Sequence, residues 1–134
     1  MEVKGFKTRV LKFADLGVPT VGFTVLAHTD TIKEKPDLVR KVVAASIKGF
    51  EDAVKEPEAA VQALLKLAPL ADAEVVRRQL AVDLGLLFSA ANTQKKLGWG
   101  PPADWESTLE VLRKYRGVET NLPATAFYTN EFLP

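Results

Sequence analysis

Few side chains in this sequence could carry out nucleophilic or imidazole chemistry. The chain has 134 residues, a single histidine, His28, and no cysteine. His28 would have to serve any catalytic triad, yet the sequence contains no Gly-x-Ser-x-Gly turn that could present an activated serine. We therefore interpret His28 as a structural or surface residue. The lack of cysteine excludes a thiol nucleophile, a thiolate metal site and a disulfide framework.

Carboxylates are the remaining candidates for metal or acid–base chemistry. Those that stand close together are Asp30, Glu34 and Asp37, then Glu51 and Asp52, then Asp104 and Glu106. The first group lacks the spacing of a calcium loop, so we interpret it as solvated charge near a helix start. Members of the two pairs point apart on a helix, where only residues three or four apart are neighbours. The sequence thus predicts no enzyme, metal site or cofactor.

Asp15 is the carboxylate with the clearest possible binding role. It ends a predicted strand directly before Gly17-Val18-Pro19, and ligands of α/β sheets usually lie where strands end. A carboxylate that stabilises the turn explains the position equally well. Gly98-Trp99-Gly100 is also glycine-rich, but it lacks the Lys-Ser/Thr of a phosphate-binding loop. Trp99 and Trp105 could stack on a ligand, although packing of this loop on the following helix is the simpler expectation.

Charge and hydropathy exclude two classes of partner. The chain has 18 basic and 17 acidic residues and a net charge of +1, and the two signs alternate along it. A nucleic-acid-binding protein usually concentrates lysine and arginine, whereas the densest basic stretch here, from Lys4 to Lys12, fits a solvated strand edge. No apolar run approaches the ~20 residues of a membrane span, and residues 1–5 lack the apolar stretch of a signal peptide.

The elements that must position these residues follow from periodicity. Residues 8–13 favour a strand, and Val21, Phe23 and Val25 alternate with polar or small residues, which predicts a second strand. From Asp30 the apolar period becomes helical. One helix is predicted to begin at Pro36, with an apolar stripe formed by Val39, Val43, Ile47, Phe50 and Val54.

Three further helices are predicted after it. Pro57 starts the second helix, and Asp72 caps the third through its carboxylate. The fourth helix buries Trp105 and Leu109 and stops at Gly117. Gly49 inside the first helix costs ~1 kcal/mol relative to alanine, so we expect another backbone to approach it closely. The apolar tail, residues 122–134, is expected to pack on the fold.

This set of elements is incomplete for a domain. Two strands are marginal alone, and stripes this broad require a larger sheet beneath them. The sequence predicts a helix-rich α/β fragment of about two strands and four or more helices.

Four stretches, taken in order, carry a resemblance to a known family. They are Phe13-Ala14-Asp15-Leu16-Gly17-Val18-Pro19, Glu34-Lys35-Pro36-Asp37-Leu38-Val39-Arg40, Lys48-Gly49-Phe50 running to Pro57-Glu58-Ala59-Ala60-Val61, and Ala126-Phe127-Tyr128-Thr129-Asn130-Glu131-Phe132-Leu133. Together they resemble the C-terminal half of ABC-transporter substrate-binding proteins of the alkanesulfonate, nitrate and thiamine-precursor group, which includes thiamine pyrimidine synthase-like proteins.

The resemblance implies a type 2 periplasmic-binding fold, with two α/β lobes that close on a solute. Residues 1–19 would be the end of the second lobe and the hinge, and residues 20–134 the C-terminal part of the first lobe. Asp15, Leu16 and Gly17 would be ligand contacts in the intact protein. Leu16 stands where relatives often have an aromatic residue, so the usual stacking contact is not expected there.

Three functions remain open. The first is part of an extracytoplasmic or periplasmic receptor that delivers a thiamine pyrimidine precursor, a sulfonate or a similar molecule to an ABC permease; this chain alone would then self-associate. The second is an autonomous helical protein-interaction domain with a closed core. The third is a fragment of a thiamine-pyrimidine synthase, for which the family's cysteine-rich signature is missing.

Overall fold

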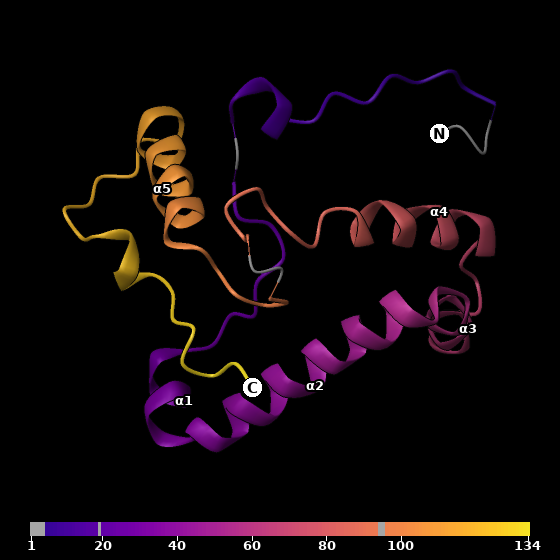
Figure 1. Cartoon of the computed structure of the whole chain (residues 1–134), viewed down its shortest axis with the longest axis horizontal. Helices are drawn as coiled ribbons and strands as arrows, with labels where there is room; N and C mark the ends of the chain where they lie inside the picture. Colours follow the sequence, from indigo (N-terminus) through magenta and orange to yellow (C-terminus); the bar gives the residue numbers. More distant parts are fainter. Residues whose placement is uncertain (1–4, 19, 94–95) are drawn as a thin grey trace.

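Five α-helices and two short 3-10 helices make up the regular structure of the described residues, which are 5–18, 20–93 and 96–134 of a computed structural model. In chain order they are η2 (Ala14–Leu16), α1 (Thr29–Glu34), α2 (Pro36–Lys55), α3 (Pro57–Leu67), α4 (Ala73–Leu84), α5 (Pro102–Arg116) and η3 (Ala124–Ala126) (Figure 1). The prediction of a helix-rich chain with four or more helices is confirmed.

Prolines set most of the helix boundaries. Pro36, Pro57 and Pro102 each occupy the start of a helix, where a missing N–H costs nothing. A proline disfavours the helical conformation for the residue before it. Lys35 and Glu56, which precede Pro36 and Pro57, accordingly have ψ of 53° and 68°, outside the helical region. The helical stretch after His28 is therefore broken into α1 and α2.

The predicted caps are also present. The Asp72 carboxylate accepts hydrogen bonds from the backbone N–H groups of Glu74, at 2.8 Å, and Val75, at 3.1 Å. α5 ends at Gly117, whose φ of 64° is left-handed.

The two predicted strands are not supported. The described part of the chain contains no β-ladder; Phe13 lies in a turn with helical dihedral angles, and Phe23 lies in a bend. Most side chains in both stretches are exposed, for example Val10 at 77% and Phe23 at 75%. A strand is completed by hydrogen bonds from a neighbouring strand, and no segment within the described ranges pairs with either stretch. Pro19 and Lys4, which also entered these predictions, lie outside the described residues.

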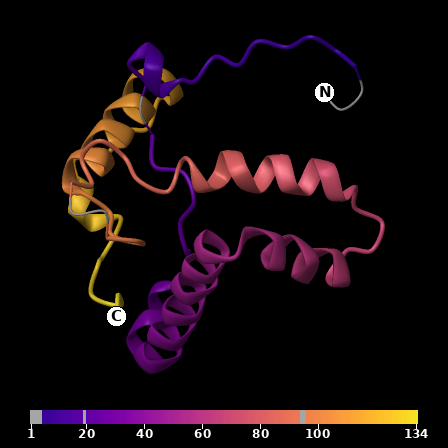
Figure 2. The same ribbon diagram turned by 45° about the vertical axis from the view of Figure 1, so that its right-hand side comes forward.

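The helices form an open arrangement. α3 and α4 lie side by side as a helical hairpin, α3 also contacts α2, and α5 contacts η3. Figure 2 shows the hairpin reaching away from α5 and the C-terminal segment. No helix in the described ranges is long and apolar enough to cross a membrane.

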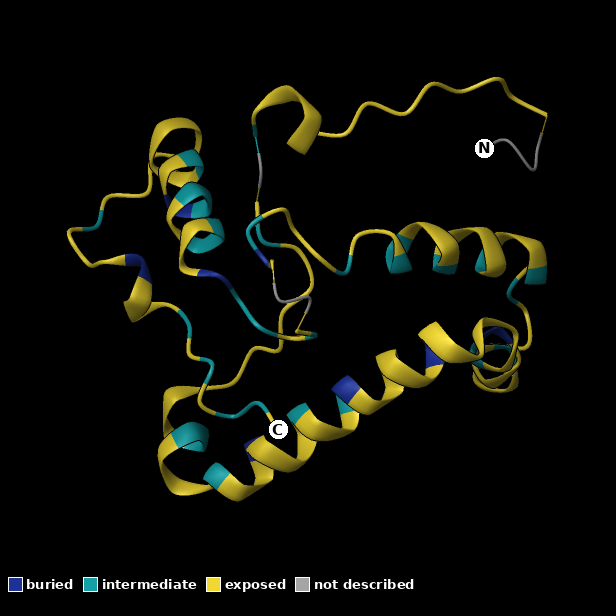
Figure 3. Cartoon of the chain, viewed as in Figure 1, coloured by how far each residue is buried: buried dark blue, intermediate teal, exposed yellow. Residues whose placement is uncertain are grey.

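The buried residues are few and dispersed, as Figure 3 shows. On α2, Val39 and Ile47 are buried as their stripe predicts, whereas Phe50 and Val54 of the same stripe stay exposed. Nothing lies within 4 Å of the position that a Gly49 Cβ would take, so the expected close backbone approach there is wrong. Other parts of the chain therefore cover only some residues of the apolar stripe on α2.

The apolar tail packs on the helices, as predicted. The Tyr128 ring stacks on Trp105 with a centroid distance of 4.8 Å and an interplanar angle of 1°. The guanidinium of Arg40 lies 5.5 Å from the centre of the Phe132 ring, within cation–π range. These contacts bring the tail to both α5 and α2.

Candidate ligand-binding site

The predicted ligand residues Asp15, Leu16 and Gly17 lie together on one backbone turn, at the end of η2. The Leu16 N–H donates to the Phe13 carbonyl at 3.0 Å, and the Gly17 N–H to that of Ala14 at 3.2 Å. Gly17 has φ of 77°, a left-handed conformation that glycine adopts at little cost. The N–H of Val18 then returns to the Phe13 carbonyl at 2.9 Å. The backbone alone therefore closes this turn.

The side chains of the turn face solvent. Asp15 and Leu16 are exposed, Leu16 at 62%. The Asp15 carboxylate makes no hydrogen bond or ion pair with the described residues, so it contributes nothing to the turn that the structure records. Its oxygens are accessible to a ligand, which is what a binding role requires. That role stays a prediction.

Neither of two surface grooves includes this turn. The larger groove has a volume of about 470 Å³ and lies between α2 and the segment that follows α4. The smaller, of about 320 Å³, lies between residues 25–28 and the helices α1 and α2. Among the described residues, the turn is therefore exposed and lies outside both of these grooves.

His28 has a structural role at the start of α1. Its Nδ1 accepts a hydrogen bond from the backbone N–H of Asp30 at 3.2 Å, and the imidazole side chain is largely exposed. In the part of the chain that the structure describes, no three His, Cys, Asp or Glu residues come together as a metal site. Of the acidic group near this helix, Asp37 pairs with Arg40 at 3.0 Å.

The loop around Gly98 and Gly100 is a packing element, as the sequence favoured. The Asn130 side chain binds Gly100 at both backbone groups, accepting from its N–H at 3.0 Å and donating to its carbonyl at 3.0 Å. A Cβ on Gly100 would lie 2.5 Å from Nε1 of Trp105. Trp105 therefore packs against the loop backbone and Tyr128. Its Nε1 is buried and has no hydrogen-bond partner in the described structure.

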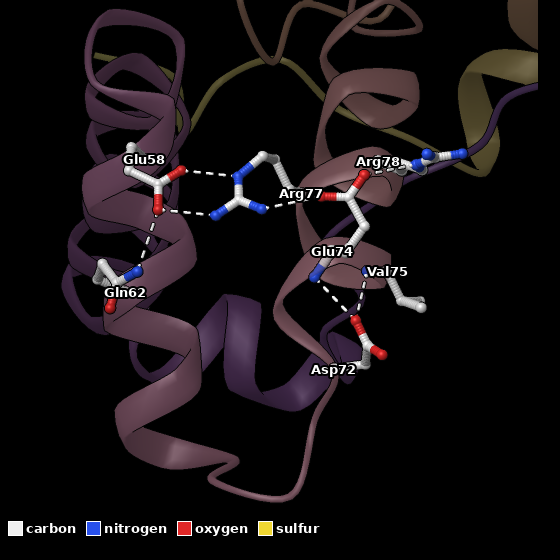
Figure 4. Close-up of polar contacts among 7 residues, drawn as sticks. All are labelled: Glu58, Gln62, Asp72, Glu74, Val75, Arg77 and Arg78. Atoms are coloured by element: carbon white, nitrogen blue, oxygen red, sulfur yellow. Dashed lines mark hydrogen bonds and ion pairs between the residues drawn. The ribbon is translucent and has the colours of Figure 1, made fainter. Parts of the chain in front are cut away.

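A polar network between α3 and α4 was not predicted. The Arg77 guanidinium donates to both Glu58 carboxylate oxygens, at 2.9 and 3.0 Å, and to Glu74 at 3.0 Å. Gln62 also donates to Glu58, and Arg78 to Glu74 (Figure 4). The spacing of Glu58 with Gln62 and of Glu74 with Arg78, four residues each, was a usable signal. The contact from Arg77 to Glu58 could not be predicted from spacing, because it forms only when the hairpin brings α3 and α4 together.

This network shifts the pKa values of its members. Hydrogen bonds from Arg77, then from Gln62, lower the pKa of Glu58 from 4.5 to about 2. Those from Arg78 and Arg77 lower the pKa of Glu74. The pKa of Arg77 rises, chiefly through its hydrogen bonds with Glu58. These groups are exposed charges that stabilise each other.

Comparisons with known proteins connect the N-terminal part of the chain to a family. The NMT1/THI5 like family model matches residues 1–60, which contain the turn at 15–17. The riboflavin-binding protein RibY of Chloroflexus aurantiacus is 30% identical over 106 residues, which cover 77% of this chain and 30% of that protein. The chain therefore spans under a third of this relative's length. Both matches confirm the resemblance to the ABC-transporter substrate-binding proteins of the alkanesulfonate and thiamine-precursor group.

Proposed function

We propose that this chain is part of an extracytoplasmic, periplasmic-type solute-binding protein that delivers a small organic molecule to an ABC importer. The observation that carries the proposal is the family match over residues 1–60. It coincides with the exposed turn whose Asp15 carboxylate has no partner in the described structure. The relative's name adds that a protein of this type binds riboflavin. A flavin therefore joins a thiamine pyrimidine precursor and a sulfonate as candidate solutes.

In this proposal the turn contributes one edge of a solute cleft. The Asp15 carboxylate accepts hydrogen bonds from amino or hydroxyl groups of the solute. The backbone at Leu16 and Gly17 approaches the solute closely, because Gly17 has no side chain and Leu16 replaces a bulkier aromatic ring. Residues 1–19 then belong to the end of the second lobe and the hinge, and residues 20–134 to the first lobe. Closure of two lobes around the solute presents the complex to the permease.

Binding, with no catalysis, is the activity that the residues support. The described residues assemble no metal cluster, and the His28 imidazole accepts a hydrogen bond at the start of α1. A thiamine-pyrimidine synthase remains the enzymatic alternative within the same family. It would need cysteine residues and a histidine other than His28, which this sequence does not supply.

The binding proposal is tested in a protein that carries this chain together with a complete first lobe. Riboflavin, the thiamine pyrimidine and a short alkanesulfonate are titrated in turn by calorimetry. We expect one of them to bind, and Asp15→Ala to weaken that binding about tenfold or more, because a hydrogen-bonded charge contributes ~1.5–3 kcal/mol. Lys12→Ala, an exposed change just before the turn, is the matched control and should leave the affinity unchanged.

Two results would contradict the proposal. One is a solute that binds equally well to the Asp15→Ala protein, which would remove the turn from the cleft. The other is micromolar binding of a solute by residues 1–134 alone, because a single wall of a cleft cannot supply such affinity.

The second candidate function, an autonomous helical interaction domain, requires a closed core. Its strongest support is the number of exposed apolar side chains, which include Leu26, Leu67 and Leu70. The same exposure argues against a self-sufficient domain. Light scattering separates the two ideas, because a stable monomer favours the autonomous domain and self-association favours a part of a larger protein.

A further inference from the structure

One ring nitrogen of His28 lies between a hydrogen-bond donor and an acceptor of the same residue. Its Nδ1 is 3.2 Å from the backbone nitrogen of Asp30 and 3.4 Å from Oδ2 of the Asp30 carboxylate. A neutral imidazole nitrogen that carries no hydrogen can accept a hydrogen bond, whereas both nitrogens of a protonated ring can only donate. The charge of the ring therefore decides which of the two groups Nδ1 binds.

The neutral ring caps α1. His28 directly precedes the helix, and its φ of −65° and ψ of 143° are the extended angles of a capping residue. Its carbonyl accepts a helical hydrogen bond from the Ile32 N–H at 3.1 Å. The first N–H groups of a helix have no partner inside the helix, and Nδ1 accepts from that of Asp30. The hydrogen of the neutral ring must then be on Nε2.

The protonated ring cannot cap the helix. Its Nδ1 carries a hydrogen and faces the Asp30 N–H as a second donor, and its positive charge at a helix start opposes the helix dipole. The Asp30 carboxylate can accept the new hydrogen. That ion pair contributes little, because both side chains are largely exposed. Protonation thus exchanges a helix cap for a weak ion pair.

No other charged group of the described chain competes for His28. The side chains of α2 that share the smaller groove with it, Leu38, Val39 and Val42, are apolar. The other charged residues from α1 to the first half of α2 are Lys33, Glu34, Lys35, Asp37, Arg40 and Lys41. Within the described ranges none of these forms an ion pair with His28 or Asp30, and Asp37 pairs with Arg40 instead. His28 is also the single histidine, and histidine is the side chain that ordinarily changes charge between pH 5 and 8.

We propose that His28 is a pH-dependent cap of α1. The neutral ring binds the Asp30 N–H. As the pH falls from about 8 to about 5, Nδ1 turns to the Asp30 carboxylate and the first turn of α1 loosens. Residues 25–28 form one wall of the smaller groove, so the change occurs at the edge of that groove. The inference does not depend on the proposed transport role, because the turn at residues 15–17 does not enter it.

The test follows the ring and the Asp30 amide in one pH titration of the ¹⁵N-labelled chain by NMR. The protein concentration is kept below the onset of self-association, which light scattering defines. At high pH the ring nitrogen shifts should place the hydrogen on Nε2. The Asp30 amide signal should move with the same midpoint as the ring. Its protection from hydrogen exchange, relative to the intrinsic rate at each pH, should fall about 2–30-fold, which corresponds to the loss of an N-cap.

Two variants separate the cap from the ion pair. His28→Asn supplies a capping side chain that does not titrate, so the Asp30 amide should stay protected over the whole pH range. Asp30→Asn keeps the backbone N–H and removes the carboxylate, so the amide at position 30 should still lose its protection when the ring gains a proton. Asp37→Asn removes the same charge near the start of α2 and is the matched control, which should behave as the unmodified chain.

Four results overturn the inference. The neutral ring could carry its hydrogen on Nδ1, where no cap is possible, or the Asp30 amide could fail to follow the titration of the ring. A change of the same size in the His28→Asn protein would assign the pH dependence to another group. A change that disappears in the Asp30→Asn protein would assign it to the carboxylate.

Discussion

Gly100 is the residue whose side chain the fold can least accept. Its backbone N–H and carbonyl are bound by Asn130, and the Trp105 indole lies directly against it. A Cβ would sit 2.5 Å from Nε1 and 3.3 Å from Cδ1 of that indole. The ring cannot move aside easily, because Tyr128 stacks on it.

We therefore expect Gly100→Ala to lower the free energy of unfolding by about 1–3 kcal/mol, as overpacking generally does. Urea denaturation followed by tryptophan fluorescence measures this change. Gly22→Ala serves as the control, since nothing lies within 4 Å of a Cβ at Gly22. An unchanged urea midpoint for Gly100→Ala would mean that the indole does not occupy this position.

Replacing Gly49 by alanine should raise the stability of the chain. It lies within α2, and its surroundings have room for a methyl group. Alanine is favoured over glycine by about 0.8–1 kcal/mol inside a helix, so Gly49→Ala should raise the urea midpoint by a corresponding amount. A lower midpoint would show that another surface contacts α2 at Gly49 in solution.

The candidate residues were predictable to different degrees. Asp72 as a cap and Gly117 as a helix end follow from local rules, because Asp72 bonds to residues two and three positions ahead and the Gly117 N–H to Leu112, five positions back in the same helix. Asp15, Leu16 and Gly17 share one turn because they are consecutive, and their role as ligand contacts stays a prediction. The groove beside α2 was not predictable, because Ile47, Phe88 and Lys96 come from separate segments that only the fold brings together.

At the scale of elements, exposed ion pairs connect α3 and α4 in the hairpin. Hydrogen bonds from Arg77 and Gln62 keep the pKa of Glu58 near 2 in the folded chain, below its ordinary value of 4.5. A carboxyl group with a lowered pKa in the folded state stabilises that state above its unfolded pKa. This contribution is lost as the pH falls from about 4.5 to about 2. The pair is exposed, so salt screens it.

Glu58→Gln should accordingly make the unfolding midpoint less sensitive to acid. We expect the thermal midpoint of the unmodified chain to fall more steeply than that of the variant between about pH 5 and pH 2. Added salt should reduce the difference. Glu110→Gln is the matched control, since Glu110 makes no ion pair in the described part of α5. Parallel pH curves for Glu58→Gln and the unmodified chain would contradict the role of this network.

Helices and strands also differ in how far the sequence predicts them. Helices were recognised because prolines, caps and apolar periodicity lie within each segment. The expectation of strands at residues 8–13 and 21–25 came from equally local patterns. A strand, however, needs a neighbour that its own sequence cannot specify, and none of the described segments pairs with either stretch.

At the scale of the whole molecule, the chain exposes more surface than a compact domain of its mass. Its accessible surface is 10586 Å². A compact monomer of 14.7 kDa would expose about 6,900 Å² by the usual scaling. The excess far exceeds the ~800 Å² that each partner buries in a standard interface. Much of it is apolar, and Leu70, for instance, is as exposed as in an extended chain.

Such a surface should drive the isolated chain to associate with itself. Exposed contiguous apolar area is stabilised by removal from water, and unpaired extended segments can pair between copies. Size-exclusion chromatography with light scattering should give a mass above 14.7 kDa that rises with concentration. Leu67→Ser combined with Leu70→Ser, at the tip of the α3–α4 hairpin, should lower that mass if the hairpin takes part, whereas Lys66→Gln should not. A constant monomeric mass over a wide concentration range, with cooperative unfolding, would contradict this prediction and favour the autonomous interaction domain.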